Sequence, residues 1–280
     1  MILVVGASGT LGRVLVAGLI DRGEQVRALT RDSSHVHTPG VSVAVADFRD
    51  AAAVELAMKG CDVVVLAAHG FVGGRGNSPE TIDRSANIAA IGRAKAAGVR
   101  HVVLVSAYGA DPRHPMSLHR AKFAAEVALK ASGLTWTIVR PTPFLETWAG
   151  VIGAHVEDRH QVVVFGKGVN PIDFVRVADV AAAISEAVGE HPPGNRESNV
   201  TGGQNRTFTT LAEEAVAASA TPVSIRHIPL GALRLLAHAA KPFSPSFARQ
   251  AQAAVVMNTT DMTAAHDPRV HRPASTPTGG

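Results

Sequence analysis

The sequence feature that most constrains the fold is a glycine-rich turn near the N-terminus. It directly follows the apolar run Ile2–Val5 and places glycine at every third position, Gly6, Gly9 and Gly12, before a helical pattern begins. The first glycine permits a tight turn, the second lets the backbone approach a pyrophosphate, and the third lets the helix pack against the sheet. The helix N-terminus then favours the charge of a phosphate. The turn therefore predicts a dinucleotide site, whose further members are Ser8, Thr10 and Leu11.

Apolar, β-branched runs alternate with helical stretches through the first half of the chain, which is the pattern of βαβ units on a parallel sheet. Each run is nearly continuous in hydrophobic residues, as expected where a strand is covered on both faces. We therefore predict an α/β fold with a Rossmann-type, doubly wound parallel sheet and a ligand crevice at the carboxyl ends of its strands. The predicted strands are Ile2–Val5, Gln25–Leu29, Ser42–Ala46, Val63–Ala67, Val102–Ser106 and Thr135–Val139, and the predicted helices are Leu11–Arg22, Ala51–Met58, Thr81–Ala97 and Leu118–Ser132.

The pattern loosens after Pro141, and we expect this region to cap the sheet and complete a substrate pocket. A single domain over residues 1–267 is predicted, with a sheet core at about 1–150, a small C-terminal substrate-capping region at about 151–267, and a flexible tail at 268–280. The elements expected in the cap are the strands Val162–Phe165 and Ile172–Val175, the helix Ala178–Val188, and the segment Gln204–Phe208 leading to the helix Thr210–Ala218.

The residues after the second and third predicted strands indicate which dinucleotide is bound. Arg31 stands where a site selective for NAD presents an acidic residue to the ribose. A guanidinium suits a 2′-phosphate instead, so we expect NADP(H) rather than NAD(H), although Asp32 is adjacent and a solvated surface arginine is the alternative. Asp47 would accept a hydrogen bond from the adenine amine and Phe48 would lie near its ring. A helix N-cap is the competing role for Asp47.

Further motifs complete a family resemblance. They are Ala67-Ala68, Ser106-Ala107-Tyr108-Gly109-Ala110, Lys122 and Arg140-Pro141-Thr142-Pro143-Phe144-Leu145-Glu146. Together with the glycine-rich turn and Asp47, they resemble the atypical short-chain dehydrogenase/reductases, in the NmrA-like or NAD(P)H-binding branch, over residues 1 to 220. That branch contains true reductases and also redox sensors that bind NADP without turnover. The resemblance therefore implies the cofactor more firmly than the activity.

The chain departs from the ordinary family pattern at the proton donor. Ordinary members place tyrosine four residues before the lysine, where this chain has Leu118 before Lys122. Tyr108 is the one tyrosine of the chain and is the candidate substitute donor, unless it packs beneath a loop. By resemblance, Lys122 would bind the nicotinamide ribose and act in proton transfer. The alternative is an exposed helix lysine paired with Glu126, and His119 is a further candidate for the pocket.

The ends of the fourth to sixth predicted strands supply the remaining predicted cofactor contacts, and the loop after Pro141 would meet the nicotinamide carboxamide. Segment 69–77 contains four glycines, so we expect it to be flexible. The predicted contacts are Ala67, Ala68, His69, Ser106, Lys122, Pro141 and Phe144.

Composition argues against several other classes of protein. The formal charge is only +4 and its Lys and Arg residues are scattered, which does not indicate nucleic-acid binding. No apolar run reaches the roughly 18 to 20 residues that span a bilayer. The single cysteine, Cys61, excludes an internal disulfide, and the 13 histidines lack the spacing of a metal site. We therefore expect a cytoplasmic protein with no metal, membrane or nucleic-acid partner.

The leading functional hypothesis is an NADPH-dependent reductase that delivers hydride to a small apolar carbonyl, enone or quinone. The alternative is a non-catalytic NADP(H)-sensing regulatory protein of the NmrA type, which the missing tyrosine favours. A third hypothesis is a sugar-nucleotide epimerase or dehydratase, which normally needs the Tyr-x-x-x-Lys pair. The partner would be a small-molecule substrate, and the oligomeric state, including a homodimer, stays open.

Overall fold

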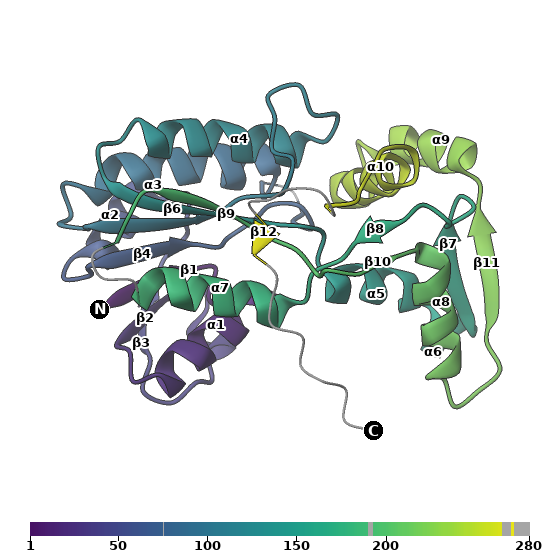
Figure 1. The fold of residues 1–280 in the computed structure, drawn as a ribbon, viewed down its shortest axis with the longest axis horizontal. Coiled ribbons are helices and arrows are strands. Elements are labelled where there is room, and N and C mark those ends of the chain that lie inside the picture. The colour runs from purple at the N-terminus through teal and green to yellow at the C-terminus, as the bar shows by residue number, and fades with distance from the viewer. Residues whose placement is uncertain (75, 190–192, 265–269, 272–280) are drawn as a thin grey trace.

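The computed structural model describes residues 1–74, 76–189, 193–264 and 270–271, and shows a parallel sheet between two layers of helices (Figure 1). The strand order is β12-β9-β6-β5-β4-β1-β2-β3, with parallel pairing throughout. The predicted Rossmann-type fold is confirmed. The strands are β1 (Ile2–Val5), β2 (Val26–Thr30), β3 (Ser42–Val45), β4 (Val63–Leu66), β5 (His101–Val105), β6 (Thr135–Pro141), β9 (Arg196–Val200) and β12 (Val270–His271).

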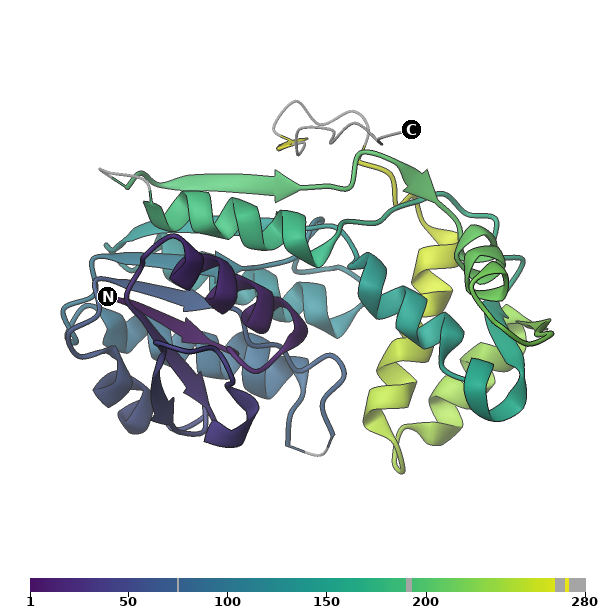
Figure 2. The same cartoon turned by 90° about the horizontal axis from the view of Figure 1, so that it is seen from below.

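Helices α1 and α7 cover one face of the sheet, as the view in Figure 2 shows, and α2, α3 and α4 cover the other. On β1, Ile2 and Val4 belong to the core on the α1 and α7 side, whereas Leu3 and Val5 belong to the core on the opposite side. A strand covered on both faces has no polar positions, which explains the continuous apolar runs. These helices are α1 (Thr10–Asp21), α2 (Ala51–Met58), α3 (Asn87–Ala94), α4 (Ser117–Lys130) and α7 (Val177–Gly189).

The helix predicted over Thr81–Ala97 is divided into two parts. It begins as the π-helix η2 (Pro79–Ala86), which Ser78 caps by accepting a hydrogen bond from the Thr81 N–H, and continues as α3. π-Helical geometry is rare and occurs often at functional sites. A short 3₁₀-helix, η1 (Ser33–His35), follows β2.

The C-terminal region forms a cap with a hydrophobic core of its own. Trp148 and Phe208 lie at its centre, with ring centroids 5.2 Å apart. Strand β7 pairs with β11 in parallel, and β8 pairs with β10 antiparallel. The elements are α5 (Leu145–Gly153), α6 (Val156–Arg159), β7 (Gln161–Phe165), β8 (Ile172–Asp173), β10 (Asn205–Arg206), α8 (Phe208–Ala217), β11 (Ser224–Ile228), α9 (Leu230–Ala240) and α10 (Pro245–Thr259).

The structure corrects one boundary predicted in the cap and leaves most of the predicted tail untested. The strand predicted at Ile172–Val175 ends earlier, because only its first two residues pair with β10. The predicted tail at 268–280 lies outside the described residues, apart from β12, which pairs with β9 at the sheet edge. The domain boundaries remain a prediction. Within the described residues, no helix combines the length and apolarity that crossing a membrane requires.

Replacing Gly12 with alanine tests the close packing of α1 on the glycine-rich turn. A Cβ atom at Gly12 would lie 2.1 Å from the Gly6 carbonyl oxygen and 2.7 Å from the Ala7 Cα atom, so backbone would have to move. We expect Gly12→Ala to lower the free energy of unfolding by about 3 kcal/mol, as overpacking of a rigid contact does. Urea titration of the purified protein measures this loss.

Gly18 in the same helix provides the matched control, because a Cβ atom there would meet no atom within 4 Å. Gly18→Ala should leave stability unchanged or raise it by up to about 1 kcal/mol, the difference in helix propensity. Equal effects of the two substitutions would show that the contact between Gly12 and Gly6 does not limit stability.

Candidate cofactor site and active site

The glycine-rich turn has the local geometry of an anion site. Gly6 adopts a positive φ of 84°, and a Cβ atom there would lie 2.8 Å from the Ala68 N atom, so the first and fourth strands converge at this point. Gly9 is the N-cap of α1, where no side chain caps the helix and no acidic residue occupies the first turn. The backbone N–H groups of that turn can therefore bind a phosphate. The turn fits the pyrophosphate of a dinucleotide.

A cleft of about 490 Å³ runs from this turn to the cap. It joins the carboxyl ends of the strands to α5 and α10, so a nucleotide at the turn would face a chamber bounded by the cap. The predicted site residues that line it are Gly6, Gly9, Thr10, Leu11, Gly12, Ala67, His69, Ser106, Tyr108, Lys122, Pro141 and Phe144. Five predicted residues lie outside this lining: Ser8, Arg31, Asp47, Phe48 and Ala68.

Two of these five, Arg31 and Asp47, lie near each other after the carboxyl ends of β2 and β3, at one edge of the sheet. Arg31 is exposed directly after β2, and Asp47 is half-buried after β3. Asp47 accepts hydrogen bonds from the Arg49 side chain, with 2.9 Å between Arg49 Nε and Asp47 Oδ1. This pairing lowers the pKa of Asp47 to about 2, with a further contribution from the charge of Arg31. The edge therefore presents two arginines around one ionised carboxylate.

The proposed N-cap role of Asp47 is wrong. Asp50 caps α2 instead, because its Oδ1 atom accepts hydrogen bonds from the N–H groups of Ala52 and Ala53 at 3.1 Å. Phe48 is only 7% exposed and belongs to the core between the sheet and its helices. Its ring is therefore a core side chain in this structure.

Ser8 and Ala68 shape the turn from the side. The Ser8 carbonyl accepts a hydrogen bond from the Arg13 guanidinium at 2.7 Å, and its hydroxyl lies 3.4 Å from Thr30 Oγ1. Ala68 supplies the backbone against which Gly6 packs. Both residues hold the turn in position between β1, β2 and β4.

Lys122 is buried next to the cleft and pairs with Asp83. Its Nζ atom lies 2.9 Å from Asp83 Oδ1 and donates to the Val105 carbonyl at 2.7 Å. The side chain is only 4% exposed, so the alternative of an exposed lysine paired with Glu126 is wrong. An ammonium has three N–H donors, of which the Val105 carbonyl accepts one; Asp83 Oδ1 is within ion-pair distance but accepts no hydrogen bond from the described residues.

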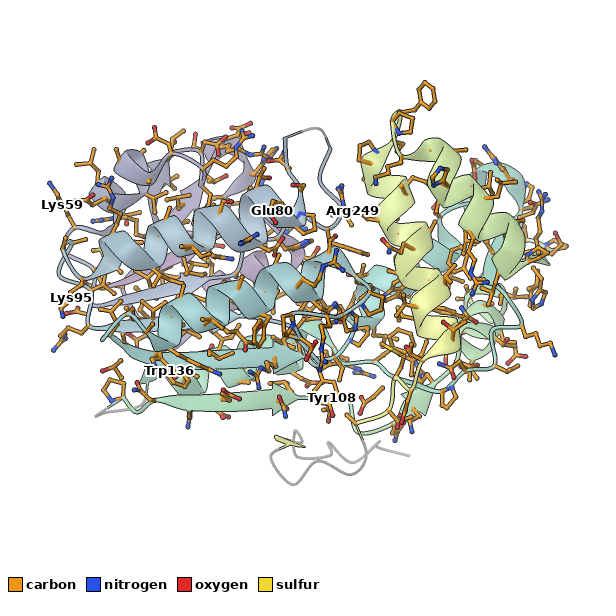
Figure 3. All side chains as sticks on the ribbon, turned by 90° about the horizontal axis from the view of Figure 1, so that it is seen from above. Lys59, Glu80, Lys95, Tyr108, Trp136 and Arg249 are labelled. Carbon is orange, nitrogen blue, oxygen red and sulfur yellow. The ribbon has the colours of Figure 1, made fainter. Side chains whose placement is uncertain are left out.

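Asp83 connects Lys122 to segment 69–77, the glycine-rich loop that follows β4. Its carboxylate is fully buried, and its Oδ2 atom accepts a hydrogen bond from the Gly70 N–H at 2.8 Å. From the other side, Arg249 of α10 donates to the carbonyls of Phe71 and Gly73 at 2.9 and 2.5 Å. Figure 3 shows Arg249 on the side of α10 that faces the sheet. The loop is therefore held by both the sheet region and the cap.

Glu126 belongs to a second buried network. Its Oε1 atom accepts hydrogen bonds from Ser106 Oγ at 2.5 Å and from Arg140 Nε at 2.9 Å. Arg140 also pairs with Glu197 on β9, and hydrogen bonding to Glu126 raises the pKa of the guanidinium. The Ser106 hydroxyl is thus held by a carboxylate, and the network fixes the ends of β5 and β6 beneath the cleft.

Two histidines stack at the cleft wall. The rings of His114 and His119 have centroids 3.9 Å apart and an interplanar angle of 15°. The pKa of His119 is lowered to about 3, mainly by burial and also by the nearby His114, while a hydrogen bond with the Tyr108 backbone opposes the shift. His119 is therefore a neutral imidazole at neutral pH, and its Nδ1 atom has no hydrogen-bond partner among the described residues.

His69 is open to the cleft and has a defined tautomer. The Phe71 N–H donates to its Nδ1 atom at 3.3 Å, so a neutral ring carries its proton on Nε2. Burial among the surrounding residues lowers the pKa of His69, an effect that Asp83 opposes and Lys122 reinforces.

Two parts of the site are absent from the residues predicted from the sequence. Asp83 could have been found, because it lies with Asn87 on a helical face whose other residues, such as Ile82, Ala86 and Ala90, are buried and apolar. A carboxylate on such a face needs a buried partner. The cap residues of the cleft, among them Ala253, Met257 and Met262, carry no recognisable motif.

The fold and the cleft define a dinucleotide-binding protein, and comparison with known proteins identifies its family. A family model described as NAD(P)H-binding matches residues 6–191, and the chain belongs to this family. This result confirms the resemblance to the NAD(P)H-binding branch of the atypical short-chain dehydrogenase/reductases. Among the described residues, no group of three or more His, Cys, Asp or Glu side chains is arranged to hold a metal ion.

Several of the similar proteins are named as reductases. The chain is 29% identical to the NAD(P)H azoreductase of Xenophilus azovorans over 226 residues, which cover 80% of this chain and 75% of that protein. It is 33% identical to the (4-alkanoyl-5-oxo-2,5-dihydrofuran-3-yl)methyl phosphate reductase of Streptomyces griseus, over 78% of this chain and 70% of the relative. The NADPH-dependent quinone oxidoreductase of Escherichia coli, solved with NADPH, has the same fold, with a TM-score of 0.75, 23% identity, and coverage of 95% and 92%.

These comparisons confirm that the chain is an NAD(P)H-dependent oxidoreductase. The open N-terminus of α1 and the crowding at Gly6 and Gly12 agree with the dinucleotide that the family binds.

The buried pair of Asp83 and Lys122 can be tested by a double-mutant cycle. Asp83→Asn leaves the Lys122 ammonium buried without its counterion, and Lys122→Met leaves the carboxylate likewise. Each change should lower the free energy of unfolding by about 3 kcal/mol, whereas the double variant should lose less than the sum. Chemical denaturation of the four proteins measures the coupling.

Glu80→Gln is the control for this cycle. Glu80 lies on the same π-helix and pairs with Arg84 at the exposed surface (Figure 3), where such pairs contribute under about 1 kcal/mol. Strictly additive losses in the cycle would contradict a coupled pair between Asp83 and Lys122.

Proposed function

We propose that this protein is an NADPH-dependent reductase that delivers hydride to a small, apolar and conjugated acceptor, such as an enone, a quinone or another carbonyl. The observation that carries the proposal is the continuity of the cleft, which joins the glycine-rich turn to an apolar chamber under the cap. Hydride transfer needs the nicotinamide and the acceptor in one space from which water is excluded. This cleft has the extent and the lining for both.

The walls of the chamber support an apolar acceptor. Met116 and Trp148 are buried side chains at its border, and Phe71, Phe144 and Met257 line it from three separate segments. Aromatic rings and thioethers pack against flat, polarisable ligands. The relatives named azoreductase and quinone oxidoreductase reduce acceptors that their names describe as conjugated groups of this kind.

Lys122 and Tyr108 have different roles in the proposed reaction. NADPH supplies the hydride when it is bound. Lys122, fixed by its ion pair with Asp83 and its hydrogen bond to the Val105 carbonyl, directs a further N–H toward the nicotinamide ribose and so positions the cofactor. Tyr108 lines the same cleft and is half-buried, with its backbone N–H bound to the Pro141 carbonyl at 2.9 Å, and it donates the proton to the substrate oxygen.

The test of this function is NADPH oxidation by the purified protein with a panel of quinones, enones and ketones. We expect turnover with at least one acceptor. Tyr108→Phe should lower kcat for enones and ketones about 100-fold, because a positioned general acid contributes about that much, while the Kd of NADPH changes less than about twofold. Tight NADPH binding without turnover on any acceptor would favour the regulatory sensor over the reductase.

Trp136→Phe is the control for Tyr108→Phe. It exchanges an indole for a phenyl ring at the opposite end of the sheet from Tyr108 (Figure 3), on β6 outside the cleft lining. Unchanged kcat in this variant, together with a loss in Tyr108→Phe, places the effect at the cleft.

Selectivity for NADPH over NADH tests the role of Arg31. Replacing its guanidinium removes charge-assisted hydrogen bonds to the 2′-phosphate, so Arg31→Ala should lower kcat/KM for NADPH about 10- to 100-fold and leave that for NADH nearly unchanged. Arg22→Ala, which removes an exposed charge after α1, should change neither value. Equal losses with both cofactors in Arg31→Ala would contradict a 2′-phosphate contact.

A further inference from the structure

The helix pair α9 and α10 exposes an apolar surface that the catalytic cleft does not use. Leu235 and Leu236 on α9 are 71% and 47% exposed, Phe243 in the connecting turn is 84% exposed, and Phe247 in the first turn of α10 is 43% exposed. We call these four residues, with the basic residues next to them described below, the α9–α10 corner. Large apolar side chains gathered in this way mark interaction surfaces.

The corner is rigid, because both helices are packed on their inner sides. Leu233 of α9 and Ala251 of α10 belong to the cap core, and Ala248 of α10 is also buried. Backbone hydrogen bonds close the turn between the helices, from the N–H groups of Phe243 and Ser244 to the Ala240 carbonyl at 3.0 and 2.7 Å. The exposed side chains are therefore held outward by a fixed backbone.

Charge is segregated in the same segment. Residues 215–260 contain four of the chain's 27 Lys and Arg residues and none of its 23 Asp and Glu residues, so this segment carries the whole formal net charge of +4. Within this segment, the positive charges of the basic residues are therefore not balanced by any carboxylate. Of the four, Arg234 and Lys241 lie at the corner, whereas Arg226 lies on β11 and Arg249 faces the sheet.

Basic side chains form a row along α9, and two exposed leucines lie beside its first member. Arg234, His238 and Lys241 recur at the i, i+4 and i+7 spacing of one helix face and are exposed, and Leu235 and Leu236 follow Arg234 directly. Arginine and lysine beside leucine and phenylalanine are the composition of helices that lie in the interface of a membrane. Figure 1 shows α9 on the outer side of α10, away from the sheet, so a flat surface can approach it.

We propose that the α9–α10 corner docks on an anionic lipid surface, with Phe243, Phe247 and the two leucines entering the headgroup region and Arg234 and Lys241 meeting lipid phosphates. A second copy of this chain fits the corner less well. A symmetric contact would bring Arg234 and Lys241 of both copies together, and segment 215–260 has no carboxylate to pair with them. Charge complementarity therefore favours lipid.

Docking at this corner would bring the catalytic cleft close to the lipid. Helix α10 carries Phe247 at one end and contributes Ala253 and Met257 to the cleft lining. The protein would then bind a membrane surface although no helix among the described residues could span the bilayer, so the expectation of no membrane partner would apply only to membrane-spanning segments. An apolar substrate dissolved in the lipid could enter the cleft without crossing bulk water.

The experiment is cosedimentation of the purified full chain with vesicles of phosphatidylcholine alone and of phosphatidylcholine mixed with phosphatidylserine. We expect about tenfold stronger partition to the anionic vesicles, weakened by salt. The pairs Leu235→Ser with Phe243→Ser, and Arg234→Glu with Lys241→Glu, should each lower that partition about tenfold or more. Thermal unfolding confirms that each variant is folded.

Matched controls lie far from the corner. Leu56→Ser changes a leucine that is 62% exposed on α2, and Lys59→Glu reverses an exposed charge at the end of the sheet remote from the cap (Figure 3). Both should bind vesicles as the wild type does. Absence of vesicle binding, or equal binding by wild-type and corner variants, would overturn the proposal. So would a wild-type dimer in sedimentation velocity that the Leu235→Ser and Phe243→Ser pair dissociates, with no vesicle binding by either protein.

Discussion

The buried carboxylate of Asp83 is the interaction on which the active-site side of this structure depends. It is fully buried, and its two oxygen atoms serve different segments, one lying 2.9 Å from Lys122 Nζ and the other accepting the Gly70 N–H. A buried charge is costly unless it is paired and hydrogen-bonded, so both segments must be in place for the carboxylate to be stable there. The position of the lysine and the path of the glycine-rich loop are thereby fixed together.

The sequence predicted the sheet well because each strand is determined by its own residues and by burial on both faces. The predicted Ile2–Val5 and Ala51–Met58 coincide with β1 and α2, and other boundaries differ by one or two residues, apart from the helix predicted to end at Ala97, which ends at Ala94. The glycine-rich turn was equally predictable, since steric crowding at Gly6 and Gly12 admits no other residue without backbone movement. Local chemistry and local geometry agree in this half of the chain.

The cap and the ion pairs could not be derived in the same way. Helical spacing suggested Glu126 as the alternative partner of Lys122, yet the structure pairs Lys122 with Asp83 on another helix and pairs Glu126 with Arg140. Partners so distant in sequence are chosen by tertiary packing. Helix α10 is rich in alanine and valine, whose pattern does not distinguish its outer face from the face that lines the cleft. The hydrophobic periodicity of the sequence therefore could not predict where α10 packs.

The separation of the hydrophobic cores has a consequence for how such a protein can evolve. The sheet is stabilised by two cores, one on each face, while the cap is built around a third that centres on Trp148 and Phe208. Substitutions in the third core alter the walls of the chamber without disturbing the packing beneath the glycine-rich turn. Substrate preference can thus drift under selection in one part of the chain while the capacity to bind the dinucleotide is inherited unchanged in another.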